Sequence, residues 1–364
     1  MNLHKEKETI TSRERVAAAF ARTEGDRVPV DFSGNPDILR RLCEHFGLKK
    51  GDKEGLYGAL GVDFRELPVR YIGPRLHAEE EGKNVDPAWG IRTRWVQHES
   101  GGYMDYCDFP LKDAGEEEVA GWPMPDPDHF NYDDAVETMK KWPVKSIHIG
   151  NPGLGDIINT AGMLRTMEKV MFDLIEEDPG FLLLTKRRME IQLEVTRRML
   201  EKARGRIDFM WLGEDLGSQN GPIINPELYR KLIKPHHAKF TDLARSFGIP
   251  VMIHSCGSSS WAFEDFLEIG ITGVDTLQPE AAGMDPAYLK KTYGERMMFH
   301  GCISTAGPLA YGTKEEAVKD AEEKLAVLKT GGGYCFSPTH LIQDNSPTEN
   351  VLGVYETVYR SGWY

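Results

Sequence analysis

The residues best suited to chemistry are a histidine and a cysteine two positions apart, His254 and Cys256, directly after the apolar run 250–253. A run of this length predicts a short buried strand, so both side chains can turn toward one point beyond its end. Imidazole nitrogen and thiolate sulfur are ligands that zinc prefers, and zinc can hold a thiolate ready for transfer chemistry. Gly257 follows and permits close approach of the backbone. The pair therefore predicts a metal site, with zinc as the metal.

The elements that would position this pair alternate regularly from residue 146 onward. Because strands that alternate with helices through short links form parallel sheets, we expect an α/β fold, a closed (β/α)8 TIM barrel, with an open doubly wound sheet as the alternative. No G-x-G-x-x-G follows a strand, which removes the main support for a dinucleotide fold. Strands are predicted at 28–32, 64–68, 146–150, 209–213, 251–254, 273–277, 297–301 and 334–337, and helices at 162–176, 179–203, 226–247, 259–269, 286–293, 314–329 and 347–361.

The N-terminal part is less regular. Thr11 or Ser12 is expected to cap a first helix, and further helices are predicted at about 36–47 and 53–60, with a hairpin around 91–96. We interpret 1–364 as a single barrel domain, with 1–60 as an N-terminal helical cap and long insertions before residue 146.

Active sites of such barrels lie at the carboxyl ends of the strands, so polar residues just beyond the predicted strands are the site candidates. Glu214 and Asp215 are candidates for catalysis, as ligands or general bases, although they could also cap a helix. His340 lies on a loop, where function is more common than packing, whereas Cys335 and His300 lie within strands and can be core residues. Asn151, Gln219 and Gln278 are expected to contact substrate, Cys302 is either a small filler or a ligand, and His236 and His237 are expected on a helix surface.

Composition limits the partners and the compartment. The formal net charge is -13 without a basic cluster, which argues against nucleic acid and anionic membranes as partners. No apolar stretch is long enough to span a bilayer, and the first residues are too polar for a secretory signal, so a cytoplasmic protein is expected. Five cysteines without scaffold spacing indicate free thiols or metal ligands. A homodimer is compatible with these patterns.

An ordered set of motifs resembles the uroporphyrinogen decarboxylase superfamily and extends over almost the whole chain. The motifs are 13–16 (RERV), 25–30 (GDRVPV), 213–219 (GEDLGSQ), 226–229 (PELY), 254–257 (HSCG), 299–305 (FHGCIST), 331–334 (GGGY) and 347–351 (PTENV). The resemblance implies a TIM barrel and one of two activities. One branch decarboxylates porphyrinogens without metal or cofactor, and the other holds cobalamin-dependent methyltransferases that use zinc bound by an H-x-C pair and a later cysteine.

The resemblance is stronger to the methyltransferase branch. The arginine-bearing segment of the decarboxylase should follow Val30, but here residues 31–35 read DFSGN, and a polycarboxylate would lose its main counter-charges. His254 and Cys256 match the zinc pair, whereas His340 stands where the third zinc cysteine is expected.

The resemblance therefore implies a zinc site of His254, Cys256 and His340, with Cys302 or Cys335 as alternative third ligands. Glu214 or Asp215 could occupy the fourth position until a substrate displaces it. The methyl group would move to or from a corrinoid (cobalamin) on a partner protein, because no D-x-H-x-x-G is present. A thiol, methyl ether or amine would be the small-molecule partner. A carboxy-lyase that acts without metal is the alternative.

Overall fold

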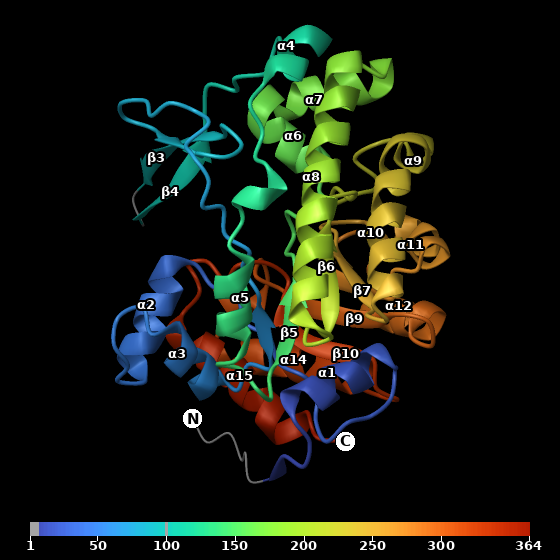
Figure 1. Ribbon diagram of the computed structural model, residues 1–364. Helices are drawn as coiled ribbons and strands as arrows, with labels where there is room; N and C mark the ends of the chain where they lie inside the picture. Colours follow the sequence, from blue (N-terminus) through green and yellow to red (C-terminus); the bar gives the residue numbers. More distant parts are fainter. Residues whose placement is uncertain (1–6, 99–100) are drawn as a thin grey trace.

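A barrel of parallel strands forms the centre of the molecule in the computed structural model, which describes residues 7–98 and 101–364 (Figure 1). Seven strands form one sheet in the order β1-β5-β6-β7-β8-β9-β10, and every neighbouring pair is parallel. The predicted α/β barrel is thereby confirmed. The strands are β1 (Phe64–Glu66), β5 (Ser146–Ile149), β6 (Phe209–Gly213), β7 (Val251–His254), β8 (Gly273–Leu277), β9 (Met298–Ile303) and β10 (Tyr334–Pro338).

The predicted strand at 28–32 closes the ring between β10 and β1. On one side, the Phe336 amide donates to Pro29 O and the Asp31 amide to Phe336 O, both at 2.8 Å. On the other side, the Asp63 amide donates to Val30 O at 2.8 Å. The segment therefore completes an eight-part wall, although only Val30 forms a ladder bridge with β10.

Helices surround this wall, and most lie close to their predicted ranges. The predicted helix at 162–176 is divided, because Thr166 has a φ of 78° and its hydroxyl caps α7 by accepting from the Lys169 amide. The helices are α1 (Ser12–Phe20), α2 (Pro36–His45), α3 (Lys53–Leu60), α4 (Glu116–Gly121), α5 (Tyr132–Met139), α6 (Ile158–Arg165), α7 (Met167–Glu176), α8 (Pro179–Ala203), α9 (Pro226–Leu228), α10 (Lys234–Ser246), α11 (Phe263–Ile269), α12 (Pro286–Tyr293), α13 (Pro308–Tyr311), α14 (Lys314–Leu328) and α15 (Thr348–Ser361).

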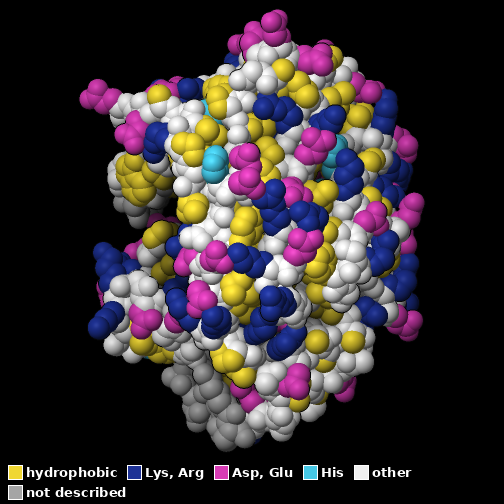
Figure 2. All heavy atoms as spheres, viewed as in Figure 1, with side chains coloured by type: hydrophobic (Ala, Val, Ile, Leu, Met, Phe, Trp, Pro, Cys, Tyr) yellow, Lys and Arg dark blue, Asp and Glu magenta, His cyan; other side chains and the backbone are white. Residues whose placement is uncertain are grey.

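A small antiparallel sheet projects from the side of the barrel. It contains β2 (Asn84–Val85), β3 (Arg92–His98) and β4 (Gly101–Tyr106), which confirms the predicted hairpin. Figure 2 shows apolar atoms on this projection, whereas Lys, Arg, Asp and Glu side chains are interspersed over the rest of the visible face. In the described parts of the chain, no helix combines the length and apolarity needed to cross a membrane.

Alternation along the strands separates two apolar layers. Outward residues such as Ile253 and Val274 pack beneath the helices in the larger cluster. Inward residues form a second cluster with Val16, Ala19 and Phe20 of α1, so this helix plugs the amino end of the barrel. The inward cluster contains Phe64, Phe209, Trp211, Met252, Met298 and Cys335. Because side chains alternate with a period of two, the next inward residue of each strand lies one layer closer to the carboxyl end.

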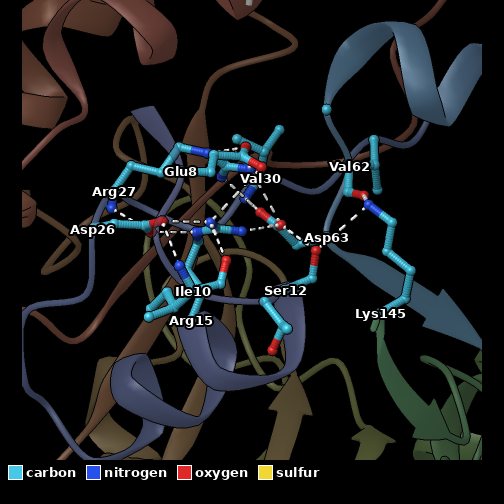
Figure 3. Close-up of polar contacts among 12 residues, drawn as sticks. Glu8, Ile10, Ser12, Arg15, Asp26, Arg27, Val30, Val62, Asp63 and Lys145 are labelled. Atoms are coloured by element: carbon cyan, nitrogen blue, oxygen red, sulfur yellow. Dashed lines mark hydrogen bonds and ion pairs between the residues drawn. The ribbon is translucent and has the colours of Figure 1, made fainter. Parts of the chain in front are cut away.

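A buried ionic network anchors α1 and the segment 28–32 at the amino end (Figure 3). The Asp63 carboxylate accepts hydrogen bonds from Arg15 at 2.8 Å, Arg27 at 2.7 Å, Ser12 Oγ at 2.6 Å and the Val30 amide at 2.8 Å. Burial alone would raise the pKa of Asp63, but the two guanidinium groups outweigh it and hold the pKa well below its ordinary value. This carboxylate therefore stays charged and fastens the barrel wall to the plug helix.

Candidate functional site

His254 ends β7 and points inward, next to Asp275 of the neighbouring strand β8. Its Nδ1 donates to Asp275 Oδ2 at 2.5 Å, which leaves Nε2 directed at the mouth of the barrel. Burial disfavours the charged imidazole, but Asp275 and Cys256 together raise the pKa of His254 well above its ordinary value. A carboxylate on the distal nitrogen is the arrangement that orients metal-binding histidines.

Two further potential ligands lie in front of His254 Nε2. Cys256 Sγ lies 3.2 Å from Nε2, and Asp215 Oδ1 lies 3.7 Å from it. One ligand atom from each of Asp215, His254 and Cys256 lies within 4.8 Å of the other two. The Cys256 amide also donates to Asp215 Oδ1 at 2.9 Å, which holds the carboxylate beside the thiol. Burial raises the pKa of the Cys256 thiol above its ordinary value and outweighs the neighbouring imidazole, which lowers it.

Two glycines allow the loops after β6 and β7 to meet at this point. Gly257 has a φ of 68°, and a Cβ atom there would lie 2.4 Å from Gly217 O. A Cβ atom at Gly217 would lie 2.4 Å from the Ser258 amide nitrogen. Because neither position has room for a side chain, Asp215 and Cys256 can be carried on backbones in direct contact.

A second histidine extends the polar chain from His254 into the barrel. His300 Nδ1 donates to Asp275 Oδ1 at 2.6 Å, and its Nε2 lies 3.2 Å from Asp31 Oδ2. Burial lowers the pKa of His300, but Asp275 and Asp31 outweigh it and raise the pKa to about 9. Asp275 therefore bridges two histidines, and the interpretation of His300 as a simple core residue is incomplete.

A cavity of about 620 Å³ opens in front of the cluster, lined in part by Asp215, His254, His340, Asp156 and Asn159. Asn159 Nδ2 donates to Asp156 Oδ2 at 2.9 Å and to Asp215 Oδ2 at 3.0 Å, so one amide holds both carboxylates. Burial raises the pKa of Asp156 to about 6. We refer to this space as the mouth cavity.

The structure places the two adjacent carboxylates in different environments. Glu214 is fully buried and accepts hydrogen bonds from the Ile157 and Ile158 amides at 3.0 Å, at the start of α6. Burial and the nearby Asp156 raise the pKa of Glu214 well above its ordinary value. His237 Nε2 lies 3.7 Å from Glu214 Oε2 and is itself fully buried, so the expectation of a helix-surface position for His237 is wrong. Asp215 alone of this pair lines the mouth cavity.

The other candidates are distributed around the rim. His340 lines the mouth cavity but lies outside the group of three converging ligands. Asn151 donates to Glu66 at 2.8 Å in a neighbouring cavity, and Gln219 is exposed. Gln278 Oε1 accepts from the Gly257 amide at 3.1 Å, which places it behind the cysteine loop.

The two alternative cysteines lie away from the ligand group. Cys302 belongs to the outer apolar cluster beneath the helices, and burial raises its thiol pKa to about 12. Cys335 lies in the inward apolar cluster, with its Sγ 3.6 Å from Met298 Sδ.

Several residues of the site were not found from the sequence. Asp275 lies inside a run that was interpreted as a strand, and a charged residue within a buried parallel strand was the signal that could have found it. Asp156 lies just before α6 and Asn159 in its first turn, where a carboxylate and an amide resemble ordinary helix-start residues. Their place beside Asp215 depends on contacts between distant parts of the chain.

Comparison with known proteins identifies the family. The model of the family described as uroporphyrinogen decarboxylase (URO-D) matches residues 163–361, more than half of the chain. The chain belongs to the uroporphyrinogen decarboxylase family. A curated uroporphyrinogen decarboxylase of Anaeromyxobacter dehalogenans (strain 2CP-C) is 28% identical over 134 residues, which are 35% of this chain and 35% of the relative. The matched segment thus spans about a third of that relative.

A solved structure of the same fold carries a different name. A methyltransferase from Methanosarcina mazei superposes with a TM-score of 0.62 over 97% of this chain and 99% of that chain, at 18% identity. This likeness confirms the barrel fold expected for the family. Members of the family are enzymes, either decarboxylases or methyltransferases.

Proposed function

We propose that this chain is a zinc-dependent methyltransferase that moves a methyl group to or from a corrinoid carried by a partner protein, with a thiol, methyl ether or amine as the other substrate. The observation that carries the proposal is the convergence of Asp215, His254 and Cys256 at the barrel mouth.

The donor atoms fit a tetrahedral zinc ion. Usual zinc bond lengths and a tetrahedral angle separate nitrogen from sulfur by about 3.5 Å and nitrogen from oxygen by about 3.4 Å. The observed separations from His254 Nε2 are 3.2 Å to Cys256 Sγ and 3.7 Å to Asp215 Oδ1. Nitrogen, sulfur and oxygen are all accepted zinc ligands, and His340 on the same cavity could supply a second nitrogen.

Each side chain has a defined task in this proposal. Asp275 fixes the tautomer of His254, so that Nε2 faces the ligand site. Cys256 would bind as the thiolate, and its proton would leave the site. Asp215, held by Asn159 and the Cys256 amide, is a ligand that an incoming substrate can displace. When bound there, zinc would supply Lewis-acid chemistry that lowers the pKa of a substrate thiol or polarises a leaving group.

The methyl transfer needs no oxidant, reductant or further reactant. With a thiol as acceptor, the sulfur lone pair forms the new carbon–sulfur bond, the thiol proton is released, and the bonding pair of the broken carbon–cobalt bond stays on the corrinoid. The corrinoid would approach from the mouth cavity, where the substrate is already held near Asp215. A cytoplasmic location is part of this proposal, since the five cysteines are free.

A metal-free carboxy-lyase is the alternative, because the family and a curated relative carry that name. A polycarboxylate substrate needs cationic side chains as counter-charges. Among the described residues that line the mouth cavity, neither lysine nor arginine occurs. This lining favours methyl transfer over decarboxylation of a polycarboxylate.

The test combines metal analysis with turnover. Purified protein is expected to contain about one zinc ion per chain by elemental analysis, and to demethylate methylcobalamin in the presence of a thiol. His254→Ala and Cys256→Ala should each lose the zinc and the activity, whereas Cys302→Ala, which removes a thiol from the outer apolar cluster, should keep both. Zinc-free protein with full activity, or zinc loss in Cys302→Ala alone, would overturn the proposal.

A further inference from the structure

The mouth cavity has a strongly acidic and aromatic wall. Three carboxylates line it, from Asp105, Asp156 and Asp215, together with the rings of Tyr106 and Phe109. The described lining residues include no lysine and no arginine, so its only basic side chains are histidines. Tyr106 is 42% exposed and lines the cavity together with both carboxylates. Burial raises the pKa of Tyr106, and the negative charges of Asp156 and Asp105 raise it further.

One buried arginine, Arg188, lies near the carboxylates of this wall. Arg188 lies near Asp156, but it is buried over the ring of Trp89, with its guanidinium carbon 4.7 Å from the ring centroid. Its Nε and Nη1 atoms are buried and have no hydrogen-bond partner in the described structure.

The acidic wall and the ligand cluster are directly connected. Asp156 and Asp215 both accept from the single Nδ2 atom of Asn159, and Asp215 is also a member of the ligand group. A small molecule whose reacting atom reaches His254 and Cys256 therefore places its other end beside Asp156. A positive group at that end would gain from the carboxylates and from the aromatic faces, whereas a negative group would be repelled.

We propose that the small-molecule substrate carries a cationic group, as an aminothiol does, with its ammonium end against Asp105, Asp156 and Tyr106 and its sulfur at the His254–Cys256 cluster. This inference rests on the proposed zinc-dependent function and specifies its substrate class. Anionic thiols and carboxylic acids are the substrates that this wall disfavours.

Three two-carbon thiols that differ only in their end group provide the test: 2-aminoethanethiol, 2-mercaptoethanol and 2-mercaptoethanesulfonate. Titration calorimetry with the zinc-loaded protein should rank their affinities in that order, with the aminothiol at least about tenfold tighter than the sulfonate. Because the three thiols also differ in acidity, the decisive quantity is the ratio of aminothiol to neutral-thiol affinity, compared between variants.

The variants Asp105→Asn and Asp156→Asn should each lower that ratio severalfold. Glu168→Gln removes an exposed carboxylate next in sequence to the lining residue Met167, and it changes the net charge by the same amount. Because Glu168 is not part of the cavity lining, its ratio should equal that of the native protein. Asp156 also accepts from the Thr160 amide in α6, and circular dichroism of each variant checks folding; Asp105→Asn carries the test if Asp156→Asn unfolds.

An unchanged ratio in the folded carboxylate variants, or tightest binding of the sulfonate, would overturn the inference. Zinc content measured on the same samples separates the two levels of the argument. A protein that holds zinc and binds thiols without charge preference contradicts the substrate class alone, whereas a protein that takes up no zinc contradicts the proposed function itself.

Discussion

The two ends of the barrel hold carboxylates in different surroundings. At the amino end, Asp63 is fully buried and its oxygens bind two arginines, a serine and a backbone amide. At the carboxyl end, the Asp215 side chain is 31% exposed and faces a cavity beside a histidine and a cysteine. A carboxylate whose charge is compensated within the protein stabilises the fold, whereas one that faces a cavity is available to a ligand.

The difference follows from what surrounds each cluster. Helix α1 plugs the amino end and shields the charged groups around Asp63 from water. These buried charges must therefore be paired within the protein. Among the described residues, no comparable plug covers Asp215 and His254, and the mouth cavity opens in front of them. Stability and chemistry are thereby separated along the barrel axis, and substitutions at the two ends should have separable effects.

The largest expected effect is at the amino end. Asp63→Asn leaves Arg15 and Arg27 buried without their shared counter-charge, and should lower the free energy of unfolding by about 3–5 kcal/mol. Urea denaturation followed by fluorescence measures this loss. Zinc uptake by the folded fraction should remain at the native level, and a loss below about 1 kcal/mol would contradict the assigned role of the network.

A smaller effect is expected behind the ligand cluster. Asp275→Asn removes the charge that orients His254, and should weaken zinc binding about 10- to 100-fold, as is typical for such supporting carboxylates. Competition with a chromogenic chelator measures the affinity. Asp242→Asn, on the exposed face of α10, is the matched control and should bind zinc like the native protein. Equal zinc affinity in both variants would remove Asp275 from the site.

The smallest effect concerns pH. Burial raises the pKa of Asp26, but the hydrogen bonds from Arg15 and the Thr9 amide outweigh it and lower the pKa from 3.8 to about 2. A lowered folded-state pKa contributes stability above the unfolded value, which is lost as pH falls from about 4 through 2. Because solvent screens part of this interaction, the contribution is on the order of 1 kcal/mol. Asp26→Asn should flatten the acid limb of the stability profile, and an unchanged limb would contradict this assignment.

Some parts of the site could be predicted from the sequence because they depend on local spacing. His254 ends β7 and Cys256 follows two residues later, so their convergence depends only on where this one strand ends. Asp275 and His300 could not be assigned in this way. Each lies inside an apolar strand, and its role appears only when sheet register places Asp275 between the two histidines.

The adjacent carboxylates illustrate the same limit. Glu214 and Asp215 are equivalent by type and position in the sequence, but successive side chains beyond a strand point in different directions. Glu214 turns to the start of α6, while Asp215 turns to the cavity. One residue of offset therefore decides which group can meet a ligand.

The sequence by itself determined the barrel and the His254–Cys256 pair, because strand–helix alternation and two-residue spacing are properties of neighbouring residues. The tertiary structure alone decided how the segment 28–32 closes the barrel, which carboxylate joins the ligand group, and that Asp105 and Asp156 form an acidic wall. These outcomes depend on register and on contacts between residues far apart in the chain, and local patterns contain no information about either.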